Sequence, residues 1–210
     1  CTLNAEDSVA TQRIQRAIDD SVGAGGCSVV LGPGQHRAGG LRLASGGDLV
    51  LSEGAVLAAL DDYAAFAGNE VSVIAEESDR AFILAADVRG AGVFGPGRID
   101  GGSHAWSSAW DEAVGTLVPK RQRPRLLVIE NSTDVQLSGF TIANSPMWTI
   151  HLIGSKRLAV SHVHIENDIR LPNNDGIVVD GCSGVTISDC VIRTADDGVC
   201  IKTSLKRDGQ

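Results

Sequence analysis

Asp134-Val-Gln-Leu-Ser-Gly-Phe-Thr-Ile142 consists of two aliphatic pairs separated by a short turn, and the chain contains this pattern again twice. The copies are Arg157-Leu-Ala-Val-Ser-His-Val-His-Ile165 and Gly184-Val-Thr-Ile-Ser-Asp-Cys-Val-Ile192, which begin at intervals of 23 and 27 residues. A weaker, glycine-rich copy covers residues 87–99. Because one copy is too short to bury an apolar face alone, we expect the copies to stack as the coils of a solenoid.

The pattern favours a parallel β-helix over a leucine-rich horseshoe. The horseshoe needs a fixed leucine ladder and a regular Asn or Cys turn, whereas a β-helix tolerates variable aliphatic residues and uneven turns. Successive coils of a β-helix lie about 4.8 Å apart, so equivalent residues form ladders. We therefore predict an all-β fold, with residues 1–210 forming a single parallel β-helix domain.

The N-terminal region predicts one amphipathic helix, with Ser8 as its N-cap and an end near Val22, before the glycines at 23–26. The residues predicted on its apolar face are Ile14, Ala17, Ile18 and Val22. At the end of a solenoid such a helix covers strand edges that would otherwise be exposed. We expect it to cap the first coil.

The composition agrees with a stack of short strands. Hydrophobic residues make up 43% of the chain but aromatic residues only 4%, and 25 glycines supply frequent turns, which disfavours a helical bundle and disorder. A net charge of −8 repels a polyanion such as DNA, and no apolar run reaches the roughly 20 residues that span a bilayer. The five cysteines match no zinc template. We expect no nucleic acid or membrane partner, no metal and no cofactor.

Residues 101–124 interrupt the repeat and predict a long loop insertion that leaves the solenoid. The stretch contains Trp106, Trp110 and a basic run at 120–123. One interpretation is a solvated insertion whose tryptophans pack against the stack. The other is one wall of a cleft, in which a sugar ring stacks on tryptophan.

Three carboxylates are expected to meet near the C-terminal coils. Asp175 and Asp197 each precede an aliphatic strand and lie 22 residues apart, which is one coil, and Asp196 stands beside Asp197. Like charges forced together raise one another's pKa, which provides a protonated acid beside ionised partners. Inverting glycosidases need both a protonated acid and an ionised base, with room for a water molecule between them. Strict strand alternation would turn Asp175 inward, so we expect the alternation to break in the turn before each glycine, with Gly176 and Gly198 supplying the bend.

The motifs around these carboxylates resemble those of a known family. Asn173-Asn-Asp-Gly176 and Ala195-Asp-Asp-Gly198 resemble the Asn-Thr-Asp-Gly and Gly-Asp-Asp motifs of the polygalacturonases, the family 28 glycoside hydrolases. The resemblance extends along nearly the whole chain. It includes the predicted helix with residues 25–36, and the segment Ser145-Pro-Met-Trp-Thr-Ile-His151. The resemblance implies a right-handed parallel β-helix with an N-terminal capping α-helix. It also implies an inverting hydrolase that is secreted or periplasmic and acts on pectic polysaccharide or oligogalacturonides.

The resemblance assigns roles by position. Asp196 resembles the general acid, while Asp175 and Asp197 resemble the pair that activates the attacking water. It implies substrate contacts from three further residues, namely Asn173, Lys202 and His151.

Some features of the family pattern are changed or absent. Asn174 replaces the usual Thr and Ala195 the usual Gly, but neither change removes a carboxylate. The family's later Gly-His-Gly and Arg-Ile-Lys motifs have no counterpart before Gln210. We therefore expect C-terminal coils to be supplied by further residues or by a second chain, and we expect little hydrolase activity from these 210 residues alone.

Three alternatives stay open at the level of the sequence. The Asp-Gly pairs could form a simple ladder of turns. The carboxylates could bind calcium, as in β-helical pectate lyases. The chain could also be a non-catalytic carbohydrate-binding or adhesin scaffold that keeps the fold without the chemistry. The exact pectic substrate and the choice between endo and exo action are not determined by these residues.

Overall fold

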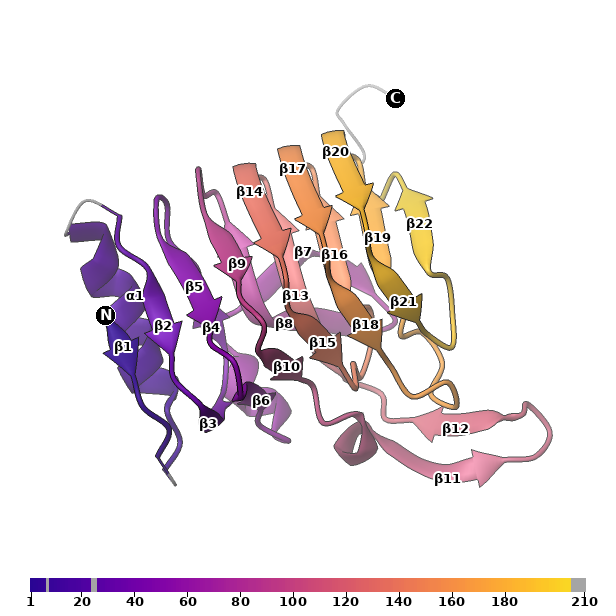
Figure 1. Ribbon diagram of the computed structural model, residues 1–210. Coiled ribbons are helices and arrows are strands. Elements are labelled where there is room, and N and C mark those ends of the chain that lie inside the picture. Colours follow the sequence, from indigo (N-terminus) through magenta and orange to yellow (C-terminus); the bar gives the residue numbers. More distant parts are fainter. Residues whose placement is uncertain (7, 24–25, 205–210) are drawn as a thin grey trace.

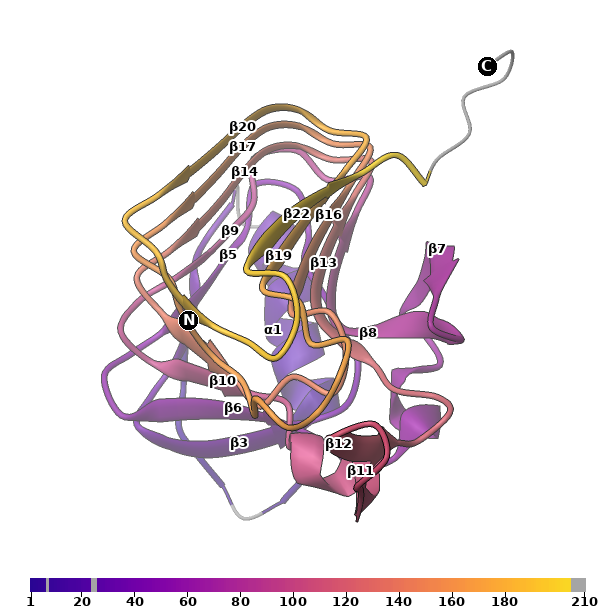
Figure 2. The ribbon, with the colours of Figure 1, turned by 90° about the vertical axis from the view of Figure 1, so that its right-hand side faces the viewer.

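Short parallel strands, stacked in successive coils, build most of the molecule (Figures 1 and 2). The computed structural model describes residues 1–6, 8–23 and 26–204. Its strands form three parallel sheets, here called sheets 1, 2 and 3, and each coil contributes one strand to each sheet in turn. The predicted parallel β-helix is therefore confirmed.

Each sheet follows the order of the chain. Sheet 1 contains β1 (Thr2–Leu3), β2 (Val29–Leu31), β5 (Asp48–Leu51), β9 (Gly92–Phe94), β14 (Thr133–Ser138), β17 (Lys156–Ser161) and β20 (Ser183–Ser188). Sheet 2 contains β3 (Gly34–Ala38), β6 (Ala55–Ala59), β10 (Arg98–Asp100), β15 (Thr141–Ala143), β18 (His164–Glu166) and β21 (Val191–Arg193). Sheet 3 contains β4 (Leu41–Arg42), β8 (Ser78–Ala86), β13 (Arg125–Glu130), β16 (Ile150–Ile153), β19 (Ile177–Asp180) and β22 (Val199–Lys202).

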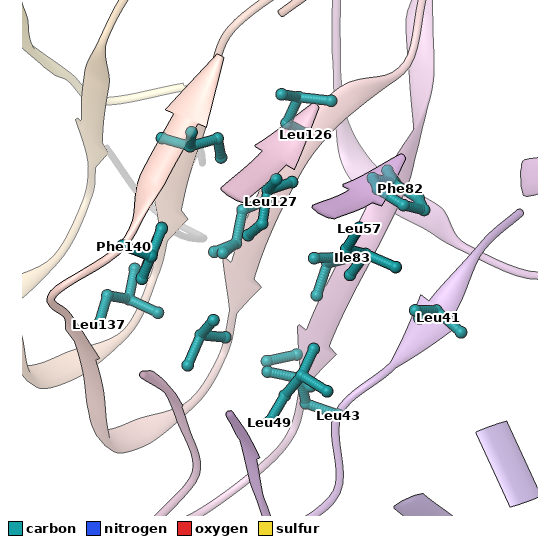
Figure 3. Close-up of a cluster of buried hydrophobic side chains, with 14 of the residues drawn as sticks. Leu41, Leu43, Leu49, Leu57, Phe82, Ile83, Leu126, Leu127, Leu137 and Phe140 are labelled. Carbon is teal, nitrogen blue, oxygen red and sulfur yellow. The ribbon is translucent and has the colours of Figure 1, made fainter. Parts of the chain in front are cut away.

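The register of the strands follows the sequence repeat. Leu137 pairs with Val160, and Val160 pairs with Ile187, which are equivalent positions of the three copies. The inner faces of the sheets meet in one aliphatic core, where Leu49, Leu57 and Ile83 come from sheets 1, 2 and 3 and are fully buried (Figure 3). The repeat therefore sets which residues stack, and burial of the stacked aliphatic ladders stabilises the coils.

Helix α1 (Thr11–Gly23) lies at the N-terminal end of the stack, as predicted (Figure 1). Its start differs from the prediction, because the Ile14 N–H donates to Ala10 O at 2.9 Å and places the first turn after Ser8. Ile14 and Ile18 are buried, but Val22 is exposed and the buried position of the last turn belongs to Ser21. The Ser21 hydroxyl donates to Ile18 O at 2.7 Å, which satisfies it without an apolar partner.

The stretch 101–124 contains more regular structure than a loop. A short 3-10 helix, η2 (Ser103–Trp106), is followed by an antiparallel hairpin of β11 (Ser107–Asp111) and β12 (Thr116–Pro119), which projects from the stack (Figure 1). Trp106 is buried, whereas Trp110 is 43% exposed. The Leu117 N–H donates to Arg170 O at 2.7 Å, so the hairpin is held against the loop before β19.

A second antiparallel element covers part of the outer face of sheet 3. Strand β7 (Glu70–Ala75) follows the 3-10 helix η1 (Tyr63–Phe66) and pairs with β8. Val71 and Val73 of β7 pack on Leu84 and Val128, which point outward from sheet 3, and form a small second cluster. Within the described residues, Cys182, Cys190 and Cys200 are free thiols, and no helix there is long and apolar enough to cross a membrane.

Candidate active site

The outer face of sheet 3 contains a row of four side chains, one from each of four successive coils. The pairs Leu127 with Ile150, Ile150 with Ile177, and Ile177 with Val199 fix the register of these coils. The same register aligns the residues that stand two positions earlier in each coil. Hydrogen bonds from Thr149 N to Asp175 O and from Gly176 N to Asp197 O, both 2.9 Å, show that the coils are still paired at this level. The row consists of Arg125, Trp148, Asp175 and Asp197, spaced by about one strand separation of 4.8 Å.

A break in strand alternation turns this row outward. Asp175 Oδ2 accepts a hydrogen bond from Cys200 Sγ at 3.4 Å, and Cys200 packs on the outer cluster of Met147, Trp148 and Val178. Ile177, two residues later, is in the inner core. Gly176 permits the break because a Cβ there would lie 2.4 Å from Gly198 O of the next coil. The expected break at Gly176 is therefore present.

Asp175 is the buried member of the three carboxylates. It is 3% exposed, while Asp196 and Asp197 are exposed. Burial, together with the charge of Asp196, raises the pKa of Asp175 above its usual value. Asp197 lies close to it, since one carboxylate oxygen of each residue and Cys200 Sγ all lie within 4.8 Å of one another. Asp196 Oδ1 accepts the Asp197 N–H at 2.9 Å, which orients the exposed carboxylate.

Cys200 belongs to this cluster as a hydrogen-bond donor. Burial and the neighbouring Asp175 carboxylate raise the pKa of the Cys200 thiol to about 12. The thiol therefore stays protonated at neutral pH and donates to Asp175. Asp175, Asp197 and Cys200 are the one group in the described part of the chain whose spacing would suit a metal ion. Calcium prefers six to eight oxygen ligands, so a set of two carboxylates and a protonated thiol fits it poorly.

Asn173 and Asn174 connect the turns that present the carboxylates. Arg123 Nη2 donates to Asn173 Oδ1 at 3.0 Å, and Asn173 adopts a left-handed backbone with φ of 61°. Asn174 Oδ1 accepts the Ala195 N–H at 2.8 Å, and its Nδ2 donates to Asp168 O at 2.8 Å. Asn174 therefore ties the turn before β19 to the turn before β22. Arg123 was not singled out in the sequence, because only the fold brings it to Asn173.

Lys202 lies against Trp148, next to the carboxylates. Its Nζ is 4.5 Å from the centre of the Trp148 ring, and Arg125 Cζ is 5.5 Å from the same centre. Cations near an aromatic ring in this range are attracted by its quadrupole. The charge of Lys202 also lowers the pKa of Asp175, as a minor contribution that opposes burial. Lys202 is thus the cation of β22 that belongs to the site.

His151 is fully buried and has a protein partner on both ring nitrogens. Arg125 Nη1 lies 2.9 Å from Nδ1, and Asp180 Oδ2 lies 3.4 Å from Nε2. Because arginine can only donate, Nδ1 accepts and the Nε2–H donates to Asp180. Burial lowers the pKa of His151 to about 4, so the ring is neutral at neutral pH. His151 therefore reaches a bound substrate only through its neighbours.

The partners of His151 are buried as well. Burial lowers the pKa of Arg125 to about 10, and its Nη2 donates to Val73 O and Ser78 O. Although burial alone raises the pKa of Asp180, hydrogen bonds from His151 and Ser204 hold it below its usual value. Sequence reasoning missed this network, which we call the Arg125–His151–Asp180 network. Its members stand on three different coils and form no contiguous motif.

The model of the glycosyl hydrolases family 28 matches residues 53–207, which include all the residues of this candidate site. The chain belongs to glycosyl hydrolase family 28. It is 30% identical to an endo-polygalacturonase of Pectobacterium parmentieri over an alignment of 221 positions, which covers 96% of this chain and 53% of that protein. This family 28 chain thus spans about half the length of the curated relative.

Solved structures give the same fold. A polygalacturonase from Erwinia carotovora ssp. carotovora superimposes with a TM-score of 0.78 and 25% identity, covering 96% of this chain and 57% of that one. A hyperthermoactive exopolygalacturonase from Thermotoga maritima gives a TM-score of 0.81 and 22% identity, covering 97% and 55%. These likenesses support the β-helical architecture of the family 28 chain.

Proposed function

We propose that this chain carries the catalytic carboxylates of an enzyme that hydrolyses glycosidic bonds of pectic polysaccharide with inversion. The observation that supports this most is the carboxylate set itself: a buried Asp175 with a raised pKa stands beside exposed Asp196 and Asp197 on the next coil. The general acid and the general base of one site require carboxyl groups in different environments. Family membership and the similar polygalacturonases support the pectic substrate class.

The roles follow from exposure and basicity. Asp196 is exposed, so its carboxyl group is open to a bound sugar and can reach the glycosidic oxygen as the general acid. Asp175 is a stronger base than a free aspartate because its pKa is raised. With Asp197, it holds and deprotonates a water molecule. No cofactor takes part in these steps.

The proposed reaction is a single displacement. Asp196 gives its proton to the glycosidic oxygen as the bond from that oxygen to the anomeric carbon breaks. The water held by Asp175 and Asp197 attacks the anomeric carbon from the opposite face and loses its proton to the carboxylate pair. The new bond lies on the opposite side of the ring, so the anomeric configuration is inverted.

The neighbours of the carboxylates support substrate binding. Lys202 offers a cation beside Asp175, and Asn173 offers a carboxamide held by Arg123. A galacturonate unit presents a carboxylate and hydroxyl groups, which such residues can bind. The Arg125–His151–Asp180 network contacts Trp148 through His151 and Arg125, and Asp180 pairs with Lys202 in the sheet register, so the network would hold both side chains in position. Because pectic polysaccharide is extracellular, we propose a secreted or periplasmic location.

The test replaces Asp196. In Asp196→Asn we expect release of reducing ends from polygalacturonate to fall by about 10²- to 10⁴-fold, with oligogalacturonide binding retained. The matched control is Asp189→Asn, an exposed aspartate in the turn between β20 and β21, which should keep full activity.

Product analysis sharpens this test. NMR of the first product should show the anomer opposite to that of the substrate linkage. Turnover that survives Asp196→Asn would contradict the assignment. Unsaturated products that require calcium would indicate a lyase, and oligosaccharide binding without any turnover by the wild-type protein would indicate a non-catalytic scaffold.

A further inference from the structure

A polar cavity lies on the outer face of sheet 2, on a different side of the β-helix from the carboxylates. Its volume is about 360 Å³, and it is bounded by β3, β6, β10 and the η2 segment. The coil of β10 lies three coils before the coil of β22, and the coil of β6 lies four coils before it. The cavity is therefore separated from the coil of β22 by about 14 to 19 Å along the stack. Nothing in the proposed hydrolysis uses this cavity.

The hollow arises from one ladder of outward-facing residues. Arg37 pairs with Ala58, and Ala58 pairs with Asp100, so a small side chain stands between two large charged ones. Arg37 and Asp100 are two strand spacings apart, about 9.6 Å. Because Ala58 carries only a methyl group, space is left above it between the two longer side chains, and the cavity of about 360 Å³ can take a single six-membered ring. Val56, Ala58 and Ala59 form an apolar floor.

The walls of the cavity are held in place by the fold. Trp106 is 4% exposed and packs edge-on against Tyr63, with ring centres 6.2 Å apart. Asp100 Oδ2 accepts from Asn144 Nδ2 at 2.8 Å, and Asp100 Oδ1 accepts the Gly102 N–H at 2.9 Å. Fixed walls lower the entropic cost of binding a small ligand.

Four further lining side chains have hydrogen-bonding groups with no partner among the residues that the structure describes. Arg37 is a donor, Asp61 an acceptor, and the Gln35 amide and the His104 ring provide both functions. A ligand with many hydroxyl groups matches this mixture, because each hydroxyl can donate and accept. An apolar floor with a few convergent polar groups is the usual anatomy of a small-molecule site.

The charges select against an acidic sugar. Asp61 and Asp100 both line the cavity, whereas the single lining arginine is Arg37. Arg98 is paired with Asp100 at 3.3 Å and with Glu166 at 3.0 Å, so its charge is shared between these two carboxylates and does not offset Asp61. A uronate placed here would bring a third carboxylate beside Asp61, which is unfavourable. A neutral pyranose avoids this repulsion.

We propose that this cavity is a second carbohydrate-binding site, which takes one neutral pyranose unit and is separate from the carboxylate site. The ring would lie on Val56 and Ala58, with its hydroxyl groups toward Arg37, Asp61 and Asp100. This site stands on the cavity alone and does not depend on the proposed hydrolysis. In a branched polysaccharide such a site would select chains that carry neutral sugars near the acidic backbone.

The experiment measures binding directly. The catalytically disabled Asp196→Asn protein is titrated with methyl galactoside, methyl xyloside, methyl rhamnoside and galacturonic acid, using NMR chemical shifts. We expect at least one neutral glycoside to saturate with a millimolar Kd, and to bind at least tenfold more tightly than galacturonic acid. The variant Ala58→Phe fills the hollow from an outward-facing position and should abolish this binding.

Two further variants keep the result interpretable. Asp61→Ala, at an exposed position, should weaken the neutral sugar at least tenfold, whereas Arg89→Ala, on an exposed arginine remote from the cavity, should leave binding unchanged. The proposal is overturned if no neutral glycoside saturates by about 50 mM, a limit well above the millimolar range expected of a single sugar. It is also overturned if binding survives Ala58→Phe, or if galacturonic acid binds more tightly than every neutral glycoside.

Discussion

The strands of sheet 3 have an inner and an outer face, and the two faces change differently along the stack. On the inner face, Ile83, Leu127, Ile150 and Ile177 repeat one kind of side chain, and all are fully buried. On the outer face, the equivalent ladder is Leu84, Val128, His151, Val178 and Cys200. The inner ladder is uniform because it must pack against both neighbouring sheets. The outer ladder is free to vary.

The outer face changes character where its cover ends. Strand β7 covers the face over β8 and β13, where Leu84 and Val128 pack on it and Arg125 donates to Val73 O. Farther along the stack, the face carries the Arg125–His151–Asp180 network and then the row that ends in Asp175 and Asp197. Substitutions on the inner face should therefore affect stability, and those on the outer face should affect activity or charge.

The largest expected effect is on the outer face at Asp175. Asp175→Asn should lower kcat by about 10²- to 10⁴-fold, because the water loses its base. The free energy of unfolding should be unchanged or slightly higher, since burial already disfavours the charged form of Asp175. Reducing-end assays and denaturant unfolding measure the two quantities. A large loss of stability with retained activity would contradict the division between the faces.

The next effect tests the one place where the outer face should control stability. His151→Leu leaves the Arg125 and Asp180 charges buried without a bridge, and should lower the free energy of unfolding by about 3–5 kcal/mol. His151→Gln keeps an acceptor for Arg125 and a donor for Asp180, so it should recover most of this loss. Urea unfolding of the two variants compares them directly. Equal losses in both would show that the hydrogen bonds of His151 do not matter.

The same residue predicts a dependence on pH. The pKa of His151 is lowered to about 4 in the folded protein, against about 6.5 when unfolded, so the unfolded chain binds the proton more tightly. Stability should therefore fall as the pH drops from about 6.5 toward 4, by at most about 3 kcal/mol from this group. Melting temperatures across this range measure it. The loss should be absent in His151→Gln, and an identical slope there would assign the effect to other groups.

A smaller effect is expected at the position that joins the two faces. Gly176→Ala would place a Cβ 2.4 Å from Gly198 O, so the coils must separate locally. We expect a loss of about 1–3 kcal/mol in the free energy of unfolding, with a drop in activity as Asp175 and Asp197 move apart. The control is Gly68→Ala, where an added Cβ meets no atom within 4 Å. Equal effects at both glycines would exclude the close approach as the cause.

The smallest effect belongs to the inner face. Ile150→Val removes one buried methyl group next to the site's coils and should cost about 0.5–1.5 kcal/mol of stability. The activity should stay within about twofold of wild type, because the outer face keeps its register. A drop in activity as large as that of Asp175→Asn would show that the faces are coupled.

Much of the fold could be predicted from the sequence because a stacked coil repeats its constraints. Leu137, Val160 and Ile187 occupy equivalent places in the repeat and pair in the structure. The start of α1 was less well determined, since Ser8 is a good N-cap by type but the first helical hydrogen bond goes to Ala10 O. Local propensity competes there with the docking of Ile14 and Ile18 onto the first coil.

The candidate site was only partly predictable. The spacing of 22 residues between Asp175 and Asp197 is close to the repeat intervals of 23 and 27 residues, and it therefore places them on adjacent coils. Arg123 lies inside the interrupting stretch 101–124 and Arg125 follows directly after it as the first residue of β13, so no periodicity points to their partners. Their roles depend on the strand register at the end of that stretch. The hairpin at 107–119 was missed for a related reason, since its strands pair with each other and not with the stack.

The separation of Asp175 and Asp197 onto two coils has a consequence for the order of folding. Each coil of a solenoid contacts only its neighbours, so coils can dock one after another. Neither the coil of β19 nor the coil of β22 contains both carboxylates. Activity during refolding should therefore appear only when β22 docks on β19, and its onset would time that single step.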